Sequence, residues 1–192
     1  MYRSSGVDFP NGSSVQSLIE PRVIVRPVTP DDRDEFLALM HASRSLHEPW
    51  ISPPLTPRAF DAYLTRMNRS DHEGLIVCRR NDPVIVGVIN LNNIVRGSFL
   101  NASLGYYAGL PYAGYGYMTS GLKAAVRYAF DGMGLHRLEA NIQPNNAPSI
   151  NLVKRCGFVN EGFSPKFLYI DGAWRDHQRW AIYHRRDTLH GA

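Results

Sequence analysis

The sequence predicts an α/β fold in which helices cover both faces of a mixed, mostly antiparallel sheet of about six or seven strands. Runs of strand-forming residues alternate with segments of helical periodicity along most of the chain. A glycine-rich loop at 109–116 joins an aromatic strand to an amphipathic helix. Near the C-terminus, Asp171-Gly172 separates two long apolar runs, a pattern that predicts an antiparallel hairpin.

Length and composition indicate one domain. The chain has 192 residues, of which 44% are hydrophobic, enough for a sizeable core. Residues 1–18 are polar and rich in Gly and Ser, so we expect a flexible arm followed by a single domain at 19–187. No apolar run reaches the roughly 20 residues that span a bilayer, and the N-terminus lacks the apolar stretch of a secretory signal. We therefore expect a cytoplasmic protein with no membrane partner.

Charge and cysteine content argue against several classes of protein. The net charge is +4 and the basic residues are scattered, which argues against DNA binding but suits an anionic ligand. Cys78 and Cys156 are the only cysteines, too few for a disulfide framework or a zinc site. We expect two structural thiols and no metal.

The N-terminal third predicts a strand and two helices. Residues 22–28 form the strand, and Thr29 caps a helix whose first turn holds Pro30 and two acidic residues. A second helix covers 58–67.

The segment 45–57 lies between these helices and contains four prolines, so we expect no regular element there. It carries Glu48 and Trp50. Trp50 either packs into the core or forms, with Glu48, one wall of a substrate site.

Three strands follow, at 73–79, 84–91 and 98–107. The run 84–91 is apolar almost throughout, which is typical of a central strand with no solvated face.

The glycine loop and its helix come next. Met118, Leu122, Ala125 and Ala129 recur at i, i+4, i+7 and i+11 and give the helix an apolar face. Free backbone N–H groups at the start of a helix bind anions, and glycine lets a phosphate approach them. The loop matches neither the Walker A pattern nor G-x-G-x-x-G. The alternative to an anion-binding loop is a tight glycine turn that only begins the helix.

The C-terminal third completes the pattern with a strand at 136–142, a helix at 148–155 and the hairpin strands 158–169 and 173–183.

Two motifs resemble those of the GNAT (Gcn5-related) N-acetyltransferases. The loop 111–116, P-Y-A-G-Y-G, resembles that family's Q/R-x-x-G-x-G/A pyrophosphate loop, with Pro111 at the Gln/Arg position. The segment 146–158 resembles N-x-x-S/A-x-x-L-Y-x-x-x-G-F, with Val153 at the Tyr position. Further segments look like the RimJ/RimL ribosomal-protein alanine N-acetyltransferases, most of all the RimJ branch: 89–99, 104–106, 136–141, 157–162 and 168–177. The likeness covers roughly residues 20 to 185.

The resemblance implies the GNAT fold and acetyl transfer from acetyl-CoA to an amine. The chain around 104–107 and the start of the following strand are expected to splay apart around the thioester. The cofactor-binding residues that it implies are Tyr106, Tyr107, Tyr112, Ala113, Gly114, Tyr115, Gly116, Tyr117, Met118, Asn141, Asn146 and Ser149.

The catalytic groups differ from those of many relatives. Val153 cannot protonate the leaving thiolate, whereas Ser149 stands where RimL-type enzymes have a serine proposed for this step; it could instead cap the helix. Leu168 replaces the RimL-type glutamate base. Asn141, through a relayed water, is then a catalytic candidate.

The sequence leaves other candidates for the general base. Glu139 and Glu48 are further candidates, although a surface residue in a salt bridge is the favoured interpretation of Glu139. His136 is expected to be structural, and the exposure of His177 is left open by the sequence.

The resemblance favours an N-terminal acceptor, an alanine of a ribosomal protein. An α-amine has a pKa of about 7.7–8.0 and lysine about 10.4, a difference of roughly 3.5 kcal/mol in the cost of the neutral nucleophile. A missing carboxylate base therefore favours an α-amine. The alternatives are an enzyme for a small-molecule amine, such as a polyamine or aminoglycoside, and a non-catalytic acetyl-CoA-binding protein. The protein would be a monomer or a homodimer.

Overall fold

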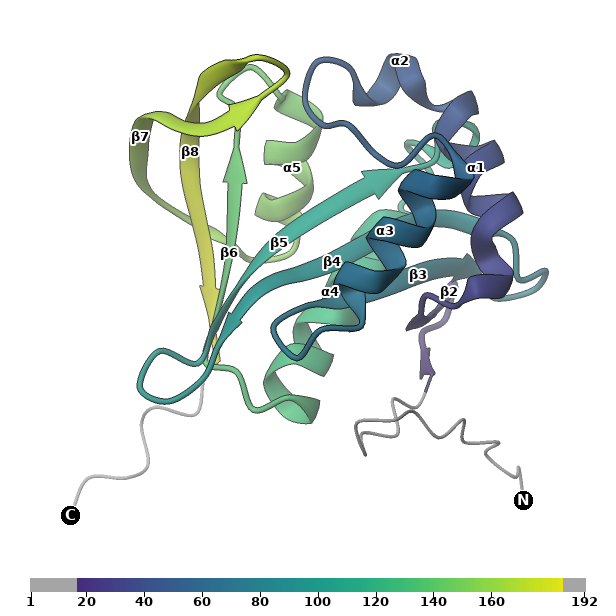
Figure 1. Cartoon of the computed structure of the whole chain (residues 1–192). Coiled ribbons are helices and arrows are strands. Elements are labelled where there is room, and N and C mark those ends of the chain that lie inside the picture. The colour runs from purple at the N-terminus through teal and green to yellow at the C-terminus, as the bar shows by residue number, and fades with distance from the viewer. Residues whose placement is uncertain (1–16, 185–192) are drawn as a thin grey trace.

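The computed structural model describes residues 17–184 and contains one eight-stranded sheet (Figure 1). Its strands run in the order β1-β2-β3-β4-β5-β6-β8-β7. Within residues 17–184, only β5 and β6 pair in parallel. The strands are β1 (Leu18–Ile19), β2 (Val23–Pro27), β3 (Glu73–Arg79), β4 (Ile85–Val95), β5 (Asn101–Ala108), β6 (Arg137–Ile142), β7 (Val159–Ile170) and β8 (Ala173–Tyr183).

The predicted mixed, mostly antiparallel sheet is confirmed, with one strand more than expected. The additional strand is β1, whose two residues pair with Val25 and Ile24. Its first residue, Leu18, falls inside the segment predicted as a flexible arm. A two-residue strand is too short to show a periodic pattern, which is why the sequence did not reveal it. The rest of the predicted arm, 1–16, and the last predicted domain residues, 185–187, lie outside the described residues.

Helices cover both faces of the sheet, as predicted (Figure 1). They are α1 (Arg33–Ala42), α2 (Arg44–His47), α3 (Pro57–Met67), α4 (Tyr117–Arg127) and α5 (Ala147–Arg155). A π-helical turn, Tyr128–Gly132, extends α4, and short 3-10 turns occur at Pro30–Asp32 and Leu110–Tyr112. No helix within 17–184 is long and apolar enough to cross a membrane.

The prediction that 45–57 contains no regular element was wrong at its start. Residues 45–47 belong to α2, which ends before the first proline of the segment, Pro49. At the other end Pro57 is the first residue of α3, a position that tolerates proline because its N–H has no helical partner. The Thr56 side chain accepts a hydrogen bond from the Ala59 amide at 3.2 Å and caps this helix.

Two hydrophobic cores flank the sheet. The first lies under α4 and α5 and includes Leu122, Ala125 and Ala129, so the predicted apolar face of α4 is buried. The second lies under α1 and α3 and is built around Phe36, Phe60 and Tyr63. Both cysteines are free and buried, and burial raises the pKa of each thiol to about 11, as expected of structural thiols.

β5 and β6 separate part of the way along their length. Their pairing runs from Asn101 with Arg137 to Leu104 with Ala140 and then stops. Beyond that point β5 pairs only with β4, and β6 only with β8. The splay predicted after 104 is therefore present. It involves the end of β6, Asn141 and Ile142, rather than its start, because the two strands are parallel and open at their carboxyl ends.

Candidate active site

The splayed strands open into a central cavity of about 1200 Å³. Its walls come from β5 and β6, the loop before α4, the first turns of α4 and α5, the segment 46–51 and the β7–β8 hairpin. Ten of the predicted site residues line it: Trp50, Tyr106, Tyr112, Ala113, Gly114, Gly116, Met118, Asn141, Asn146 and Ser149.

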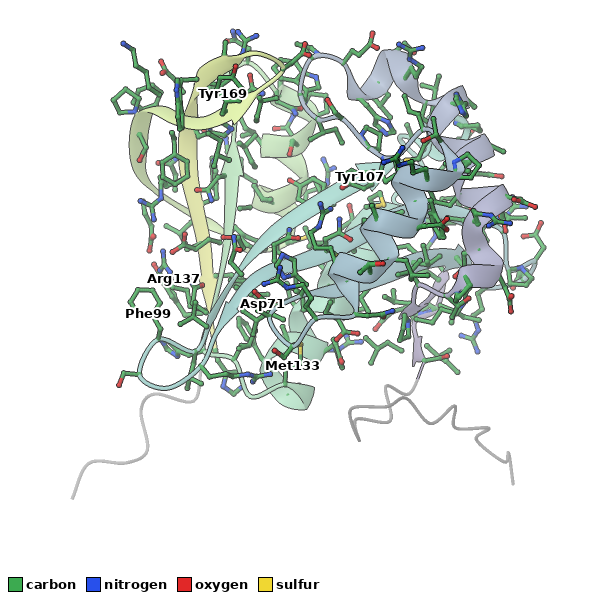
Figure 2. All side chains as sticks on the ribbon, viewed as in Figure 1. Asp71, Phe99, Tyr107, Met133, Arg137 and Tyr169 are labelled. Carbon is green, nitrogen blue, oxygen red and sulfur yellow. The ribbon has the colours of Figure 1, made fainter. Side chains whose placement is uncertain are left out.

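Four predicted residues do not line the cavity. Tyr107 points to the opposite face of β5 from Tyr106, packs against the core under α1 and α3, and accepts a hydrogen bond from Asn90 Nδ2 at 3.2 Å (Figure 2). The side chains of Tyr115 and Tyr117 also lie outside the cavity wall, and Tyr115 is exposed. Period-2 alternation could have separated Tyr106 from Tyr107, because only one of two successive strand residues faces a given side.

Glu48 is the fourth. Its carboxylate is exposed and pairs with Arg44 at 3.2 Å. Arg44 is the first residue of the short helix α2, and Glu48 directly follows that helix. The structure therefore brings Trp50, but not Glu48, to the proposed acceptor wall.

The loop before α4 has the features of an anion cradle. Gly114 and Gly116 adopt φ angles of +82° and +83°, which favour glycine, and a Cβ at Gly114 would meet nothing within 4 Å. Gly116 is the N-cap of α4 and offers no capping side chain, so the N–H groups of the first turn are left for another acceptor. The α4 dipole adds roughly half a positive charge there, and no acidic residue occupies the first turn.

Arg22 supplies a full positive charge beside this cradle. Its guanidinium stacks 5.2 Å from the centroid of the Tyr117 ring, and Nη1 lies 3.2 Å from the place a Cβ would take at Gly116. Cradle and arginine together fit the pyrophosphate of a coenzyme A molecule. Sequence reasoning missed Arg22, because it lies far from the loop along the chain and no spacing pattern connects the two.

Two hydroxyl groups, one from β5 and one from α5, meet at the cavity wall. The phenol oxygen of Tyr106 lies 2.5 Å from Ser149 Oγ. Burial raises the pKa of Tyr106 to about 12, although the hydrogen bond to Ser149 lowers it, so the phenol stays protonated at neutral pH. The Asn146 side chain accepts a hydrogen bond from the Ser149 amide at 3.2 Å and caps α5. Val153 is fully buried.

The opposite wall is fixed by backbone hydrogen bonds. His47 Nε2 lies 2.9 Å from the carbonyl oxygen of Ala108, at the end of β5. Gln143 Nε2 donates to the carbonyl of Trp50 at 3.4 Å. Together these bonds hold the segment 47–50 against both splayed strands. The sequence did not reveal His47, because a single histidine at the end of a four-residue helix carries no pattern.

The cavity wall is basic. Arg22, Arg66 and Arg155 contribute to it, and none of the described residues that line it is Asp or Glu. Glu139 is held by Arg137 Nε at 2.9 Å and Arg179 Nη2 at 3.3 Å, so the salt-bridge interpretation of this residue is confirmed. Within 17–184, His, Cys, Asp and Glu form no group of three that could hold a metal ion.

Known proteins are similar to this chain in sequence and in fold. The acetyltransferase (GNAT) domain family matches residues 22–159. The [ribosomal protein uS5]-alanine N-acetyltransferase of Escherichia coli (strain K12) is 35% identical over 175 residues, covering 86% of this chain and 89% of that protein.

Solved structures agree with the sequence match. Ribosomal-protein-S5-alanine acetyltransferase from Vibrio fischeri has a TM-score of 0.79 at 26% identity and covers 88% of this chain and 97% of its own. Mycobacterium smegmatis RimJ, in complex with CoA-disulfide, has a TM-score of 0.77 at 25% identity and covers 88% of this chain and 85% of its own. The chain therefore belongs to the GNAT family, and it is an N-acetyltransferase that uses acetyl-CoA.

Proposed function

We propose that this enzyme acetylates the N-terminal α-amine of a protein, an alanine of a ribosomal protein. The observation that carries the proposal is the charge of the cavity wall, which holds three arginines and no carboxylate among its described residues. A polyamine or an aminoglycoside carries several positive charges and requires carboxylates for complementarity. A peptide N-terminus brings a single ammonium, so its binding needs no acidic groove.

The similarity to a ribosomal-protein alanine acetyltransferase supports the same acceptor. So does the basicity argument, since an α-amine is easier to deprotonate than a lysine by roughly 3.5 kcal/mol. A ribosomal acceptor also agrees with the cytoplasmic location expected from the sequence.

Within the site the chain's own residues divide the work. The α4 cradle and Arg22 bind the pyrophosphate, and the segment 47–50 with the β7–β8 hairpin encloses the acceptor. Ser149, hydrogen-bonded to Tyr106, lies on the α5 side of the splay and holds a proton for the leaving sulfur.

Thiol release from acetyl-CoA tests the acceptor class. The panel contains a peptide beginning with Ala, the same peptide with a blocked N-terminus, free lysine, spermidine and an aminoglycoside. We expect release with the unblocked peptide alone. Release with spermidine or the aminoglycoside and not with the peptide would contradict the proposal.

A further inference from the structure

We propose that His177 is the general base of the transfer and that its Nε2, together with the side-chain oxygen of Asn141, binds the attacking amine. The inference rests on the proposed function and deepens it, because it assigns the proton acceptor of the same site.

His177 reaches the cavity from β8. Asn141 on β6 pairs directly with Arg179 on β8, and directly paired residues of an antiparallel pair project to the same side. His177 lies two residues from Arg179 along the strand and so shares that side. Both His177 and Asn141 line the cavity.

This face of the sheet is the one opposite the hydroxyl pair. Ala140, the neighbour of Asn141, packs into the core under α4 and α5, so Asn141 projects to the other side. Tyr106 packs against that same core, with Ser149 on α5. An amine at His177 would therefore attack from one face of the splay while the leaving sulfur is protonated from the other.

The ring of His177 is held in one orientation. Its side chain is only 2% exposed, and Nδ1 lies 2.9 Å from the carbonyl oxygen of Arg175. A carbonyl can only accept, so Nδ1 carries the proton and Nε2 keeps its lone pair. The Phe167 ring, 6.0 Å away from centroid to centroid, covers another side of the imidazole.

Burial, rather than the charged groups around it, keeps His177 neutral. Burial lowers the pKa of the imidazole, and this outweighs the Arg175 carbonyl and the Asp176 carboxylate, which raise it. Arg175 and Arg179 flank it on the same face of β8. From β6, Glu139 is engaged by Arg179, and from β7 the Lys166 amide donates to Asp176. Above pH 6.5 the ring is therefore uncharged and able to accept a proton.

Asn141 supplies the second acceptor. Its Oδ1 is buried without a hydrogen-bond partner. A buried amide oxygen without a partner costs roughly 1–3 kcal/mol, so such a group is ready for a donor on a ligand. An ammonium or amine presents N–H donors of the required kind.

Among the described residues, no carboxylate lines the cavity to compete for this role. Glu139 and Glu48 are paired with arginines, and Leu168 occupies the position of the RimL-type glutamate. Burial raises the pKa of Glu73 to about 7, but this residue does not line the cavity.

Each proton released in the proposed transfer has an acceptor. The bound ammonium gives one N–H proton to His177 Nε2, and its nitrogen then forms the C–N bond to the acetyl carbon as the C–S bond breaks. The Ser149–Tyr106 pair protonates the sulfur, and the second N–H proton of the acceptor refills this pair through water. His177 releases its proton to solvent, so one proton leaves overall.

Two measurements test this assignment. The first uses the unmodified protein: nitrogen-15 NMR of the His177 ring at pH 7.5, assigned with the His177→Gln spectrum. We expect a neutral ring protonated at Nδ1. A ring that is charged, or protonated at Nε2, would overturn the inference whatever the enzyme's acceptor is.

The second measurement is single-turnover transfer to the unblocked Ala peptide between pH 7 and pH 9.5, with acetyl-CoA affinity measured alongside. His177→Gln should keep the affinity and lose about 10²- to 10⁴-fold in rate at pH 7. The ratio of the wild-type rate to the His177→Gln rate should fall about tenfold by pH 9.5, because an α-amine with a pKa near 8 then deprotonates without a base.

His47→Gln is the matched control, since His47 is a buried histidine on the other wall with Nε2 engaged by a backbone carbonyl. Any defect of this variant should not change with pH. A pH-independent defect in His177→Gln would show a purely structural role and overturn the inference. A wild-type enzyme that transfers to no unblocked peptide would instead end the proposed function, while the NMR result still decides the state of His177.

Discussion

The phenol oxygen of Tyr106 lies 2.5 Å from Ser149 Oγ, and this hydrogen bond joins β5 to α5 across the splay. In the sequence, Ser149 matches a family motif and Tyr106 belongs to a strand, and nothing in their spacing connects them. The pair places two hydroxyl groups on the cavity wall, whereas Val153, at the position of the family's tyrosine, is fully buried.

Removing either hydroxyl should slow the transfer by a similar factor. We expect Ser149→Ala and Tyr106→Phe each to lower the single-turnover rate about 10²-fold, the lower end for general acid catalysis. The double variant should lose little more, because the two groups act as a unit. Equal additive losses in the double-mutant cycle would show that the hydroxyls act independently.

The glycine loop before α4 predicts that a Cβ added at Gly114 weakens coenzyme A binding. Gly114→Ala should weaken coenzyme A binding about tenfold, because a methyl group enters the space in which the pyrophosphate approaches the backbone. Gly134→Ala is the control: Gly134 also has a positive φ, +68°, and open space around its Cβ, but it does not line the cavity. Both variants should lose about 1–2 kcal/mol of stability from the strained conformation. Calorimetry should show weaker coenzyme A binding only for Gly114→Ala.

The proline segment predicts a difference between two neighbouring residues. Trp50→Ala should raise the KM for the peptide acceptor about tenfold, because its side chain forms part of the cavity wall. Glu48→Ala should leave this KM within about twofold, since the carboxylate is exposed and its pair with Arg44 is worth less than about 1 kcal/mol. Steady-state kinetics with a fixed, saturating acetyl-CoA concentration measure both. If Glu48→Ala raised the KM and Trp50→Ala did not, Glu48 and not Trp50 would belong to the acceptor site.

The pair of half-buried Arg26 and buried Asp32 predicts a pH-dependent stability. Burial raises the pKa of Asp32, but the hydrogen bonds from Arg26, at 2.6 Å, and from Thr29 outweigh it and lower the pKa below 3.8. Its contribution is therefore complete above about pH 4 and is lost as the pH falls through the folded-state pKa.

Asp32→Asn should reduce the free energy of unfolding by about 3 kcal/mol at pH 7, with a smaller difference at pH 3. Asp34→Asn, an exposed carboxylate with a long 3.5 Å pair to Arg33, should change it by less than about 0.5 kcal/mol. Urea denaturation at both pH values provides the comparison. An equal effect of Asp32→Asn at pH 3 and pH 7 would rule out the carboxylate as its source.

Local patterns in the sequence determined most of the fold and the glycine loop before α4. The helical period of α4, Thr29 and Pro30 ahead of α1, the Asp171-Gly172 turn and the loop glycines each act over a few residues. Such interactions are visible in one stretch of chain, and the structure has these elements where the sequence predicts them.

Tertiary structure alone decided which distant residues share the cavity. Arg22 at the cradle, His47 on Ala108, and His177 on the same cavity wall as Asn141 come from segments that no sequence spacing relates. Their meeting depends on strand order and register, in particular on the one parallel pair, β5 and β6, opening at its carboxyl ends. Register also determined that Tyr106 faces the cavity and Tyr107 the core, because a shift of one residue exchanges the faces of a strand.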